Sequence, residues 1–335
     1  MGLPHGKVPV KVLREVVFKH LGVKDSDVIL GPSLGEDGSV VRVGDKVLIS
    51  AMDPITGAVK RIGWLAVNIN ANDVATFGVR PRFFSSCILL PEGSTEETVR
   101  VICTQIDSAA MRLGISIIGG HSEVTPGLRQ PIVVGHSIGV TEPGRYVTSG
   151  GSGEGDLLIL TKGAGIEGTA ILAVDRYEDL RSKLDEETLT SAMKFYERIS
   201  VVEDAVTAFE AGGVTAMHDP TEGGVAGGIH EMADAAKLGF EIFEDRIPIH
   251  QETLEVCRFF NIDPLQLISS GALLISVRPE CADEVVDELS SHGIRASVIG
   301  RFLGDPEVRV LVRRDGRRTE LVRPVMDHLW LALKR

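Results

Sequence analysis

The chain has 335 residues, a length that suggests about two domains. Its hydrophobic content of 43% excludes a globally disordered chain, and its formal net charge of −12 argues against a general nucleic-acid-binding surface. The four scattered cysteines, the missing secretory pattern and the lack of any apolar run of about 18 residues predict a cytoplasmic protein without a membrane partner.

The first half of the chain is predicted to be rich in strands, with two long helices. A turn-rich loop over 31–38 carries Glu36 and Asp37, and Asp53 is expected just beyond a strand. Ser94 or Thr95 is expected to cap a long helix. The predicted helices cover 9–21, 63–78 and 96–113, and the strands cover 39–43, 46–50, 83–90, 115–118 and 132–140, with a loop over 119–127.

A Gly- and Ser-rich break over 149–156 marks the expected domain boundary, which gives domains 1–149 and 150–335. Helices and strands alternate after it, so we expect a mixed α+β fold with a β-rich N-terminal and an α/β C-terminal domain. Strands are predicted at 157–161, 214–217, 240–243, 272–277, 296–301 and 308–312, and helices at 167–174, 186–210, 225–236, 254–260 and 282–292.

The helix over 63–78 is apolar apart from four polar residues, Asn68, Asn70, Asn72 and Asp73. Buried amides and carboxylates are costly unless something satisfies them. Two interpretations stay open at this point. The polar groups form a helix cap or an internal hydrogen-bond network, or they present oxygen ligands to a cation or a polyphosphate.

Four acids lie in turns or polar helical stretches, and together they carry the strongest chemical signal: Asp37, Asp53, Asp73 and Asp219. Each alone is more typical of a turn or a cap. Mg²⁺ is usually held by few carboxylates together with water and phosphate oxygens. The four acids and the neighbouring asparagines therefore favour a metal–nucleotide site.

Two glycine-rich turns precede predicted helices, and their members are Gly163, Gly165, Gly168, Gly223 and Gly224. Helix N-termini of this kind can offer backbone N–H groups to phosphate, while close helix packing is the alternative. Residues 163–168 also match the dinucleotide pattern GxGxxG. The acid expected about 20 residues later would fall in the polar stretch 179–185 and not at a strand end, so an NAD(P)-dependent oxidoreductase is a remote alternative.

Three histidines, His121, His136 and His218, raise a zinc-hydrolase alternative. The sequence has no HExxH and no close ligand pair, which weakens this interpretation. His218 is better interpreted as a residue that lines a site beside Asp219.

Taken in order, five motifs resemble those of the aminoimidazole ribonucleotide (AIR) synthase superfamily of ATP-dependent enzymes. The resemblance spans roughly residues 30–310 and is carried by Gly35–Gly38, Met52-Asp53, Asn70–Ala75, Gly119–Gly127 and Asp219–Gly224. Residues 165–172 look most like the hydrogenase-maturation (HypE) branch. That branch carries a cysteine at its extreme C-terminus and tends to have lysine where this chain has Glu123, whereas the last cysteine here is Cys281.

The resemblance implies a two-domain fold, a homodimer paired through the N-terminal domains, and ATP with Mg²⁺ used to phosphorylate an amide-type oxygen. It implies metal ligation by Asp37, Asp53, Asp73 and Asp219, with Asp73, Asp219 and His121 as catalytic residues. It assigns nucleotide or substrate contacts to Asn72, Gly119, Gly120, His121 and Glu123. The alternative from another class is a nucleotide-binding maturation partner with little turnover of its own.

Overall fold

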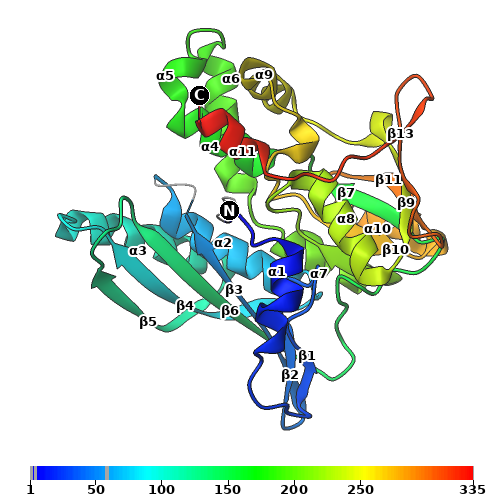
Figure 1. The fold of residues 1–335 in the computed structure, drawn as a ribbon, viewed down its shortest axis with the longest axis horizontal. Coiled ribbons are helices and arrows are strands. Elements are labelled where there is room, and N and C mark those ends of the chain that lie inside the picture. The colour runs from blue at the N-terminus through cyan, green and yellow to red at the C-terminus, as the bar shows by residue number, and fades with distance from the viewer. Residues whose placement is uncertain (1–2, 4–5, 57–59, 335) are drawn as a thin grey trace.

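The computed structural model describes residues 3, 6–56 and 60–334. Within them the chain forms two β-sheets that lie side by side, each with its own helices (Figure 1). The first sheet has the strand order β1-β2-β3-β6-β4-β5, and the second has the order β13-β12-β9-β11-β7-β10-β8. This confirms the mixed α/β, two-domain fold class. The sequence passes from β6 to β7 across residues 142–156, and the boundary between 149 and 150 stays a prediction.

The first sheet is antiparallel apart from the parallel pair β4–β5. Along β6 buried and half-buried residues alternate, as expected for a sheet with one face on the core. Helix α2 covers that face and packs against β3, β6 and α3. The elements are α1 Val10–Glu15, β1 Val28–Leu30, β2 Ser39–Val43, β3 Lys46–Ile55, α2 Ile62–Ala75, β4 Pro81–Leu90, α3 Glu96–Leu113, β5 Ser116–Val124 and β6 Ile132–Thr141.

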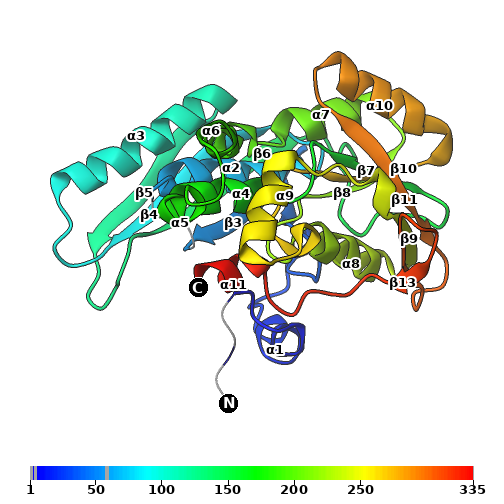
Figure 2. The ribbon, with the colours of Figure 1, turned by 90° about the horizontal axis from the view of Figure 1, so that it is seen from above.

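The second sheet is buried on both faces. Along β7, Ile159 faces the cluster that includes α7 and α10, whereas Leu158 and Leu160 face the cluster around α8. Figure 2 shows α7 and α10 on one side of this sheet and α8 on the other. The elements are β7 Leu157–Thr161, α4 Ile166–Asp175, α5 Tyr177–Leu180, α6 Glu186–Met193, α7 Val202–Ala211, β8 Val214–His218, α8 Gly224–Ala236, β9 Gly239–Phe243, α9 Gln251–Phe260, β10 Leu274–Val277, α10 Ala282–Ser291, β11 Ala296–Leu303, β12 Arg309–Val312, β13 Arg318–Glu320 and α11 His328–Leu333.

Helix α2 is buried on nearly its whole circumference, including Asn68, Asn70, Asn72 and Asp73. The three asparagines are satisfied inside the protein. Asn68 donates to the Trp64 carbonyl at 2.8 Å, and Asn70 donates to the Ala66 carbonyl at 2.8 Å. The internal hydrogen-bond network therefore accounts for the amides of this helix. Asp73 has a different environment, described with the site below.

Several predicted element ends are wrong, and pairing explains the two that matter for the site. Strand β3 pairs with β6 as far as Ile55, so Asp53 lies within the strand and not beyond it. The predicted loop over 119–127 is mostly strand, because β5 pairs with β4 as far as Val124. At Gly120 a Cβ atom would lie 2.2 Å from the Ser86 carbonyl oxygen, so glycine permits this pairing.

The remaining differences are local. The single helix predicted over 186–210 is interrupted between α6 and α7, where Asn72 binds the backbone of Ile199 and Val201. Helix α3 is capped by Thr95, whose partner in the capping box is Thr98, three residues on. The helix predicted over 9–21 is the shorter α1 followed by a 3₁₀ turn, and β1, β13, α5 and α11 have no counterpart in the prediction. In the described part of the chain no helix is long and apolar enough to cross a membrane.

Asn72 should be costlier to lose than Asn68. Its amide donates to Ile199 and accepts from the Val201 N–H, whereas Asn68 binds only within its own helix. We expect Asn72→Ala to lower the free energy of unfolding by about 2–4 kcal/mol, because buried backbone groups lose their partners. The matched Asn68→Ala should cost about 1 kcal/mol. Urea unfolding measures both, and equal losses would contradict this account.

Candidate functional site

Four acids from separate elements converge at the junction of the two sheets. Asp37 lies in the turn before β2, Asp53 on β3 and Asp73 on α2, while Asp219 directly follows β8. Asp73 and Asp219 are 4% and 1% exposed. The four acids identified from the sequence are thus brought into one neighbourhood.

The pKa values of these acids report how closely they lie. Burial, then the charges of Asp37 and Asp53, raises the pKa of Asp219 to about 8. Burial raises the pKa of Asp53 to about 6, and burial with the charge of Asp53 raises that of Asp73 well above its usual value. Neither carboxylate oxygen of Asp219 has a hydrogen-bond partner. Burying an ionised carboxylate without partners costs free energy, so binding of a cation or a proton to Asp219 is favourable.

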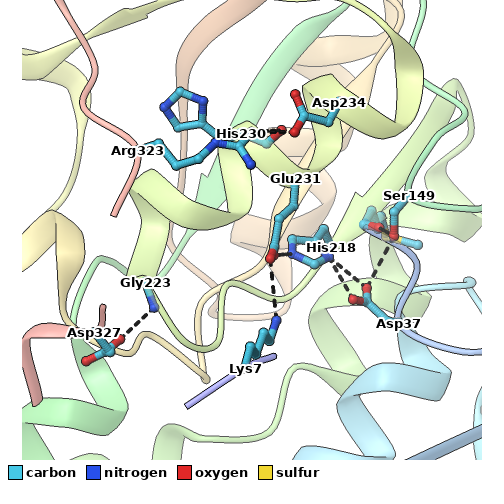
Figure 3. Close-up of polar contacts among 11 residues, drawn as sticks. Lys7, Asp37, Ser149, His218, Gly223, His230, Glu231, Asp234, Arg323 and Asp327 are labelled. Atoms are coloured by element: carbon cyan, nitrogen blue, oxygen red, sulfur yellow. Dashed lines mark hydrogen bonds and ion pairs between the residues drawn. The ribbon is translucent and has the colours of Figure 1, made fainter. Parts of the chain in front are cut away.

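His218 lies between two carboxylates (Figure 3). Its Nδ1 atom is 2.8 Å from Asp37 Oδ1, and its Nε2 atom is 2.9 Å from Glu231 Oε2. Burial alone would lower the pKa of this imidazole, but Asp37 and Glu231 raise it well above its usual value. The two carboxylates therefore favour the protonated ring, which joins β8 to α8 and to the turn before β2. Its role as a site-lining residue stays a prediction.

Lys7 is the second cation of the site. Its Nζ atom is 3.5 Å from Glu231 Oε1, and its backbone N–H donates to Glu222 at 2.8 Å. Burial would lower the pKa of the Lys7 ammonium, but the nearby carboxylates, Glu231 foremost, raise it. Burial would raise the pKa of Glu231, and the two cations, Lys7 and His218, lower it to about 2.

Asn70 fixes the position of Asp53. Its carbonyl oxygen accepts from the Asp53 N–H at 2.7 Å, and its amide donates to the Asp53 carbonyl at 3.2 Å. The family resemblance implied no definite role for Asn70, although the Asn70–Ala75 motif begins with it, and none for Glu222, which lies inside the Asp219–Gly224 motif. No motif marks Lys7 or Glu231, because their roles arise from the packing of α8 and the N-terminal segment.

Asn72 and the turn glycines have internal partners in this structure. The N–H groups of these glycines all donate within the chain: Gly163 to Thr161, Gly165 to Ser269, Gly168 to Ile268, Gly223 to Asp327 and Gly224 to Thr221. A Cβ atom at Gly168 would lie 2.4 Å from the Leu267 side chain. The alternative of close packing therefore describes these turns, and no free phosphate donor is found among them.

The predicted group Gly119, Gly120, His121 and Glu123 lies on β5, apart from the acids. Asp53 is level with Gly135 of β6, Ser86 of β4 and Gly120 of β5. Three strand spacings separate Asp53 from Gly120, or roughly 14 Å. His121 contacts Glu123 at 3.0 Å on this exposed edge strand. Within one chain, these residues do not join the acidic site.

The structure does not support the zinc-hydrolase alternative or the NAD(P)-dependent oxidoreductase alternative. The candidate zinc ligands do not converge: His121 is exposed, His136 binds Ser50, and His218 is held by carboxylates. Across residues 6–56 and 60–334, no three His, Cys, Asp or Glu side chains are placed to hold one metal ion. Strand β7 pairs antiparallel with both of its neighbours, so the GxGxxG turn lies outside any parallel dinucleotide-binding unit.

These features define a two-domain α/β protein with a buried acidic site at the junction of its sheets. Family models describe the same two units. The model of the AIR synthase related protein N-terminal domain matches residues 35–141, and that of the C-terminal domain matches residues 153–313. The chain belongs to the AIR synthase-related family.

Two curated relatives point to one branch of this family. The chain is 30% identical over 302 residues to a putative hydrogenase expression/formation protein of Methanocaldococcus jannaschii, covering 88% of each chain. It is 29% identical over 281 residues to the carbamoyl dehydratase HypE of Escherichia coli, covering 81% of this chain and 80% of the relative. The predicted similarity to the HypE branch is confirmed.

Solved structures of HypE proteins are also similar to this chain. The crystal structure of E. coli HypE, a hydrogenase maturation protein, matches with a TM-score of 0.73 and 26% identity, covering 84% of this chain and 86% of that one. A HypE crystallised in complex with ATP has the same fold, with a TM-score of 0.71 at 21% identity and 98% coverage of both chains.

Asp219 gives a pH-dependent prediction. A carboxyl group whose pKa rises from about 4 unfolded to about 8 folded binds its proton more tightly in the native state. Its contribution to stability is complete below about pH 4 and is lost as the pH rises through about 8. We expect Asp219→Asn, relative to the native protein, to gain at least about 1 kcal/mol of unfolding free energy between about pH 5 and pH 8 in the absence of ligand.

The exposed Asp287→Asn on α10 is the matched control and should show no such gain. Chemical denaturation at several pH values measures all three proteins. A difference between Asp219→Asn and the native protein that does not change with pH would show that Asp219 is ionised without penalty.

Proposed function

We propose that this protein is an ATP-dependent enzyme of the HypE type, which transfers a phosphoryl group to an amide-type oxygen of its substrate. The observation that carries the proposal is the buried group of carboxylates at the domain junction, with the unpartnered Asp219 at its centre. Relatives named carbamoyl dehydratases, which match about four fifths of this chain, support the reaction class.

The chemistry has a clear physical need. An amide oxygen is a poor leaving group. When it attacks the γ-phosphorus, the bond to ADP breaks and the oxygen becomes part of a phosphate ester. The phosphate can then depart with that oxygen. Positioning and electrostatic stabilisation supply most of the catalysis in phosphoryl transfer.

Mg²⁺ fits the residues present. Hard oxygen ligands surround the site, and Asp219 has two buried oxygens without partners. We propose that Asp37, Asp53, Asp73 and Asp219 hold the metal, which neutralises phosphate charge when bound. Because no three of the described acidic, His or Cys side chains are already placed to hold one metal ion, water and phosphate oxygens would supply further ligands. We therefore propose that metal and nucleotide bind together.

The contacts of His218, Asn70 and Lys7 hold the acidic residues of the site in position. The imidazolium holds Asp37 in place, Asn70 holds the backbone of Asp53, and Lys7 supplies a cation at the mouth. These groups position the other carboxylates, and none of them forms a hydrogen bond with the oxygens of Asp219. Asn72 and the turn glycines have structural roles in this proposal.

Mg²⁺-dependent ATP hydrolysis tests the proposal. We expect ATP with Mg²⁺ to raise the melting temperature of the native protein and to be hydrolysed slowly, because hydrolysis replaces transfer when the substrate is missing. Asp73→Asn should lower the hydrolysis rate about 100-fold or more, whereas Asp287→Asn should leave it unchanged. A native protein that neither binds nor cleaves ATP would contradict the proposal, and binding without turnover would favour the maturation-partner alternative.

We further propose a homodimer paired through the first sheet. Strand β5 is an edge strand whose residues are all exposed, and it carries Ile117, Ile118 and Val124, which are 47%, 56% and 55% exposed. Exposed apolar edge strands invite pairing. A second copy covering β5 would also bury His121 and Glu123, the residues implied by the family resemblance.

Sedimentation velocity tests this pairing. The native protein should sediment as a dimer, and Ile118→Glu should shift it towards monomer because a charge would be buried at the interface. The equally apolar but remote Val325, which is 99% exposed, provides the control Val325→Glu, which should stay dimeric. A monomeric native protein would contradict the proposed pairing.

A further inference from the structure

A cavity of about 520 Å³ adjoins the acidic site. Asp53 and Lys7 line it, together with Glu222 from the turn before α8. Glu167 and Ser270 line it as well, although neither was assigned a role by the motifs. Its size is that of a pocket for a small organic molecule.

Glu167 is the unexplained group in this cavity. It lies in the first turn of α4, inside the GxGxxG segment, and is 4% exposed. Its Oε2 atom has no hydrogen-bond partner, and neither has the hydroxyl of Ser270, which is fully buried. Burial raises the pKa of Glu167 to about 7, against the opposing effect of the nearby Ser270 hydroxyl, so the two side chains lie close together without a well-formed hydrogen bond between them. Two unpartnered polar side chains on the wall of one cavity indicate a ligand that supplies hydrogen-bond donors.

The charge of the cavity lining indicates that the hydrogen-bond donors of the ligand are cationic. Four carboxylates line the cavity, from Asp53, Glu167, Glu222 and Asp327, and Lys7 is the cation among the described lining residues. The ammonium of Lys7 is already paired with Glu231. Asp327 accepts from the N–H groups of Gly223 and Leu329, and Glu222 accepts from the Lys7 N–H. Asp53 belongs to the acidic site, and the Oε2 atom of Glu167 is buried without a partner, so Glu167 is the candidate anchor. An anionic ligand would meet uncompensated negative charge here.

Much of the remaining lining is apolar. Ile69, Ile171 and Ile268 line the cavity, and so do Leu329 and Trp330 of the C-terminal helix α11. A hydrocarbon or aromatic body fits such a wall, and the Trp330 ring can contact a cation favourably.

We propose that this cavity binds the protonated nitrogen of an organic cation, an ammonium or amidinium on an apolar body, with Glu167 as its anchor and Ser270 as a second polar contact. This inference rests on the proposed function in one respect, namely that the cation is taken to be part of the molecule that accepts the phosphoryl group. Because Asp53 lines the same cavity, a substrate held by Glu167 would reach the acidic site.

Titration calorimetry of the native protein at about pH 8, where amines remain protonated, provides the first test. The probes are phenethylamine and benzamidine, with phenethyl alcohol and hydrocinnamate as neutral and anionic counterparts. We expect the two cations to bind at least about 10-fold more tightly than the alcohol, since a hydrogen bond to a charged group contributes about 1.5–3 kcal/mol. The anion should show no binding. The ammonium and amidinium arms identify which nitrogen group is preferred.

Variants provide the second test. Glu167→Gln keeps the shape of the side chain and should weaken cation binding at least about 10-fold, while Glu178→Gln on exposed α5 should leave it unchanged. Ser270→Ala should produce a smaller loss. Equal binding of alcohol and amine to the native protein, no cation binding, or an unaffected Glu167→Gln would overturn the proposal. The first comparison needs no variant, so misfolding of Glu167→Gln does not block the test.

These titrations are made without ATP. Thermal stabilisation of the native protein by ATP and Mg²⁺ is measured separately. A native protein that binds the cation but not ATP would contradict the proposed function alone, and one that binds ATP but no cation would contradict the cavity proposal alone.

Discussion

Buried negative charge is the constraint on which the rest of this structure depends. Asp37, Asp53, Asp73 and Asp219 come from four separate elements, and each would be more stable in water. The fold tolerates them through the imidazolium of His218 and the ammonium of Lys7, which neutralise Asp37 and Glu231, and through the raised pKa values of the others. Asp219 is left without a partner. A site arranged in this way stores unfavourable free energy that a bound cation can release.

Each of the two sheets contributes residues to this site. Strand β3 supplies Asp53 and the buried helix α2 supplies Asp73, and Asn70 of α2 binds the backbone of Asp53. The second sheet supplies His218 and Asp219 at the end of β8. Asn72 joins α2 of the first half to the segment before α7 in the second half by two hydrogen bonds. The cavity beside Asp53 adjoins the proposed phosphoryl-transfer site, and its wall combines apolar side chains with carboxylates.

The periodicity of the sequence predicted most helices and strands, because the second sheet is built from short apolar runs punctuated by glycine. The four acids could be identified because each lies in a turn or in an apolar setting where a carboxylate is unusual. Lys7 and Glu231 could not, since each is an ordinary charged residue until the N-terminal segment and α8 pack against β8. Glu222 lies inside the Asp219–Gly224 motif, but its contact with Lys7 depends on the same packing. The glycine turns were ambiguous for a related reason: a tight packing turn and a phosphate-binding turn share one pattern, and only hydrogen-bond partners distinguish them.

Equilibrium binding of ATP to the native protein, with Mg²⁺ and with EDTA, tests whether the buried acids form a metal–nucleotide site. Carboxylates that lack a cation repel polyphosphate, whereas a metal ion joins the two. We expect tight binding with Mg²⁺ and at least about 100-fold weaker binding with EDTA. Equal affinity under both conditions would show that the buried acids are not a metal–nucleotide site.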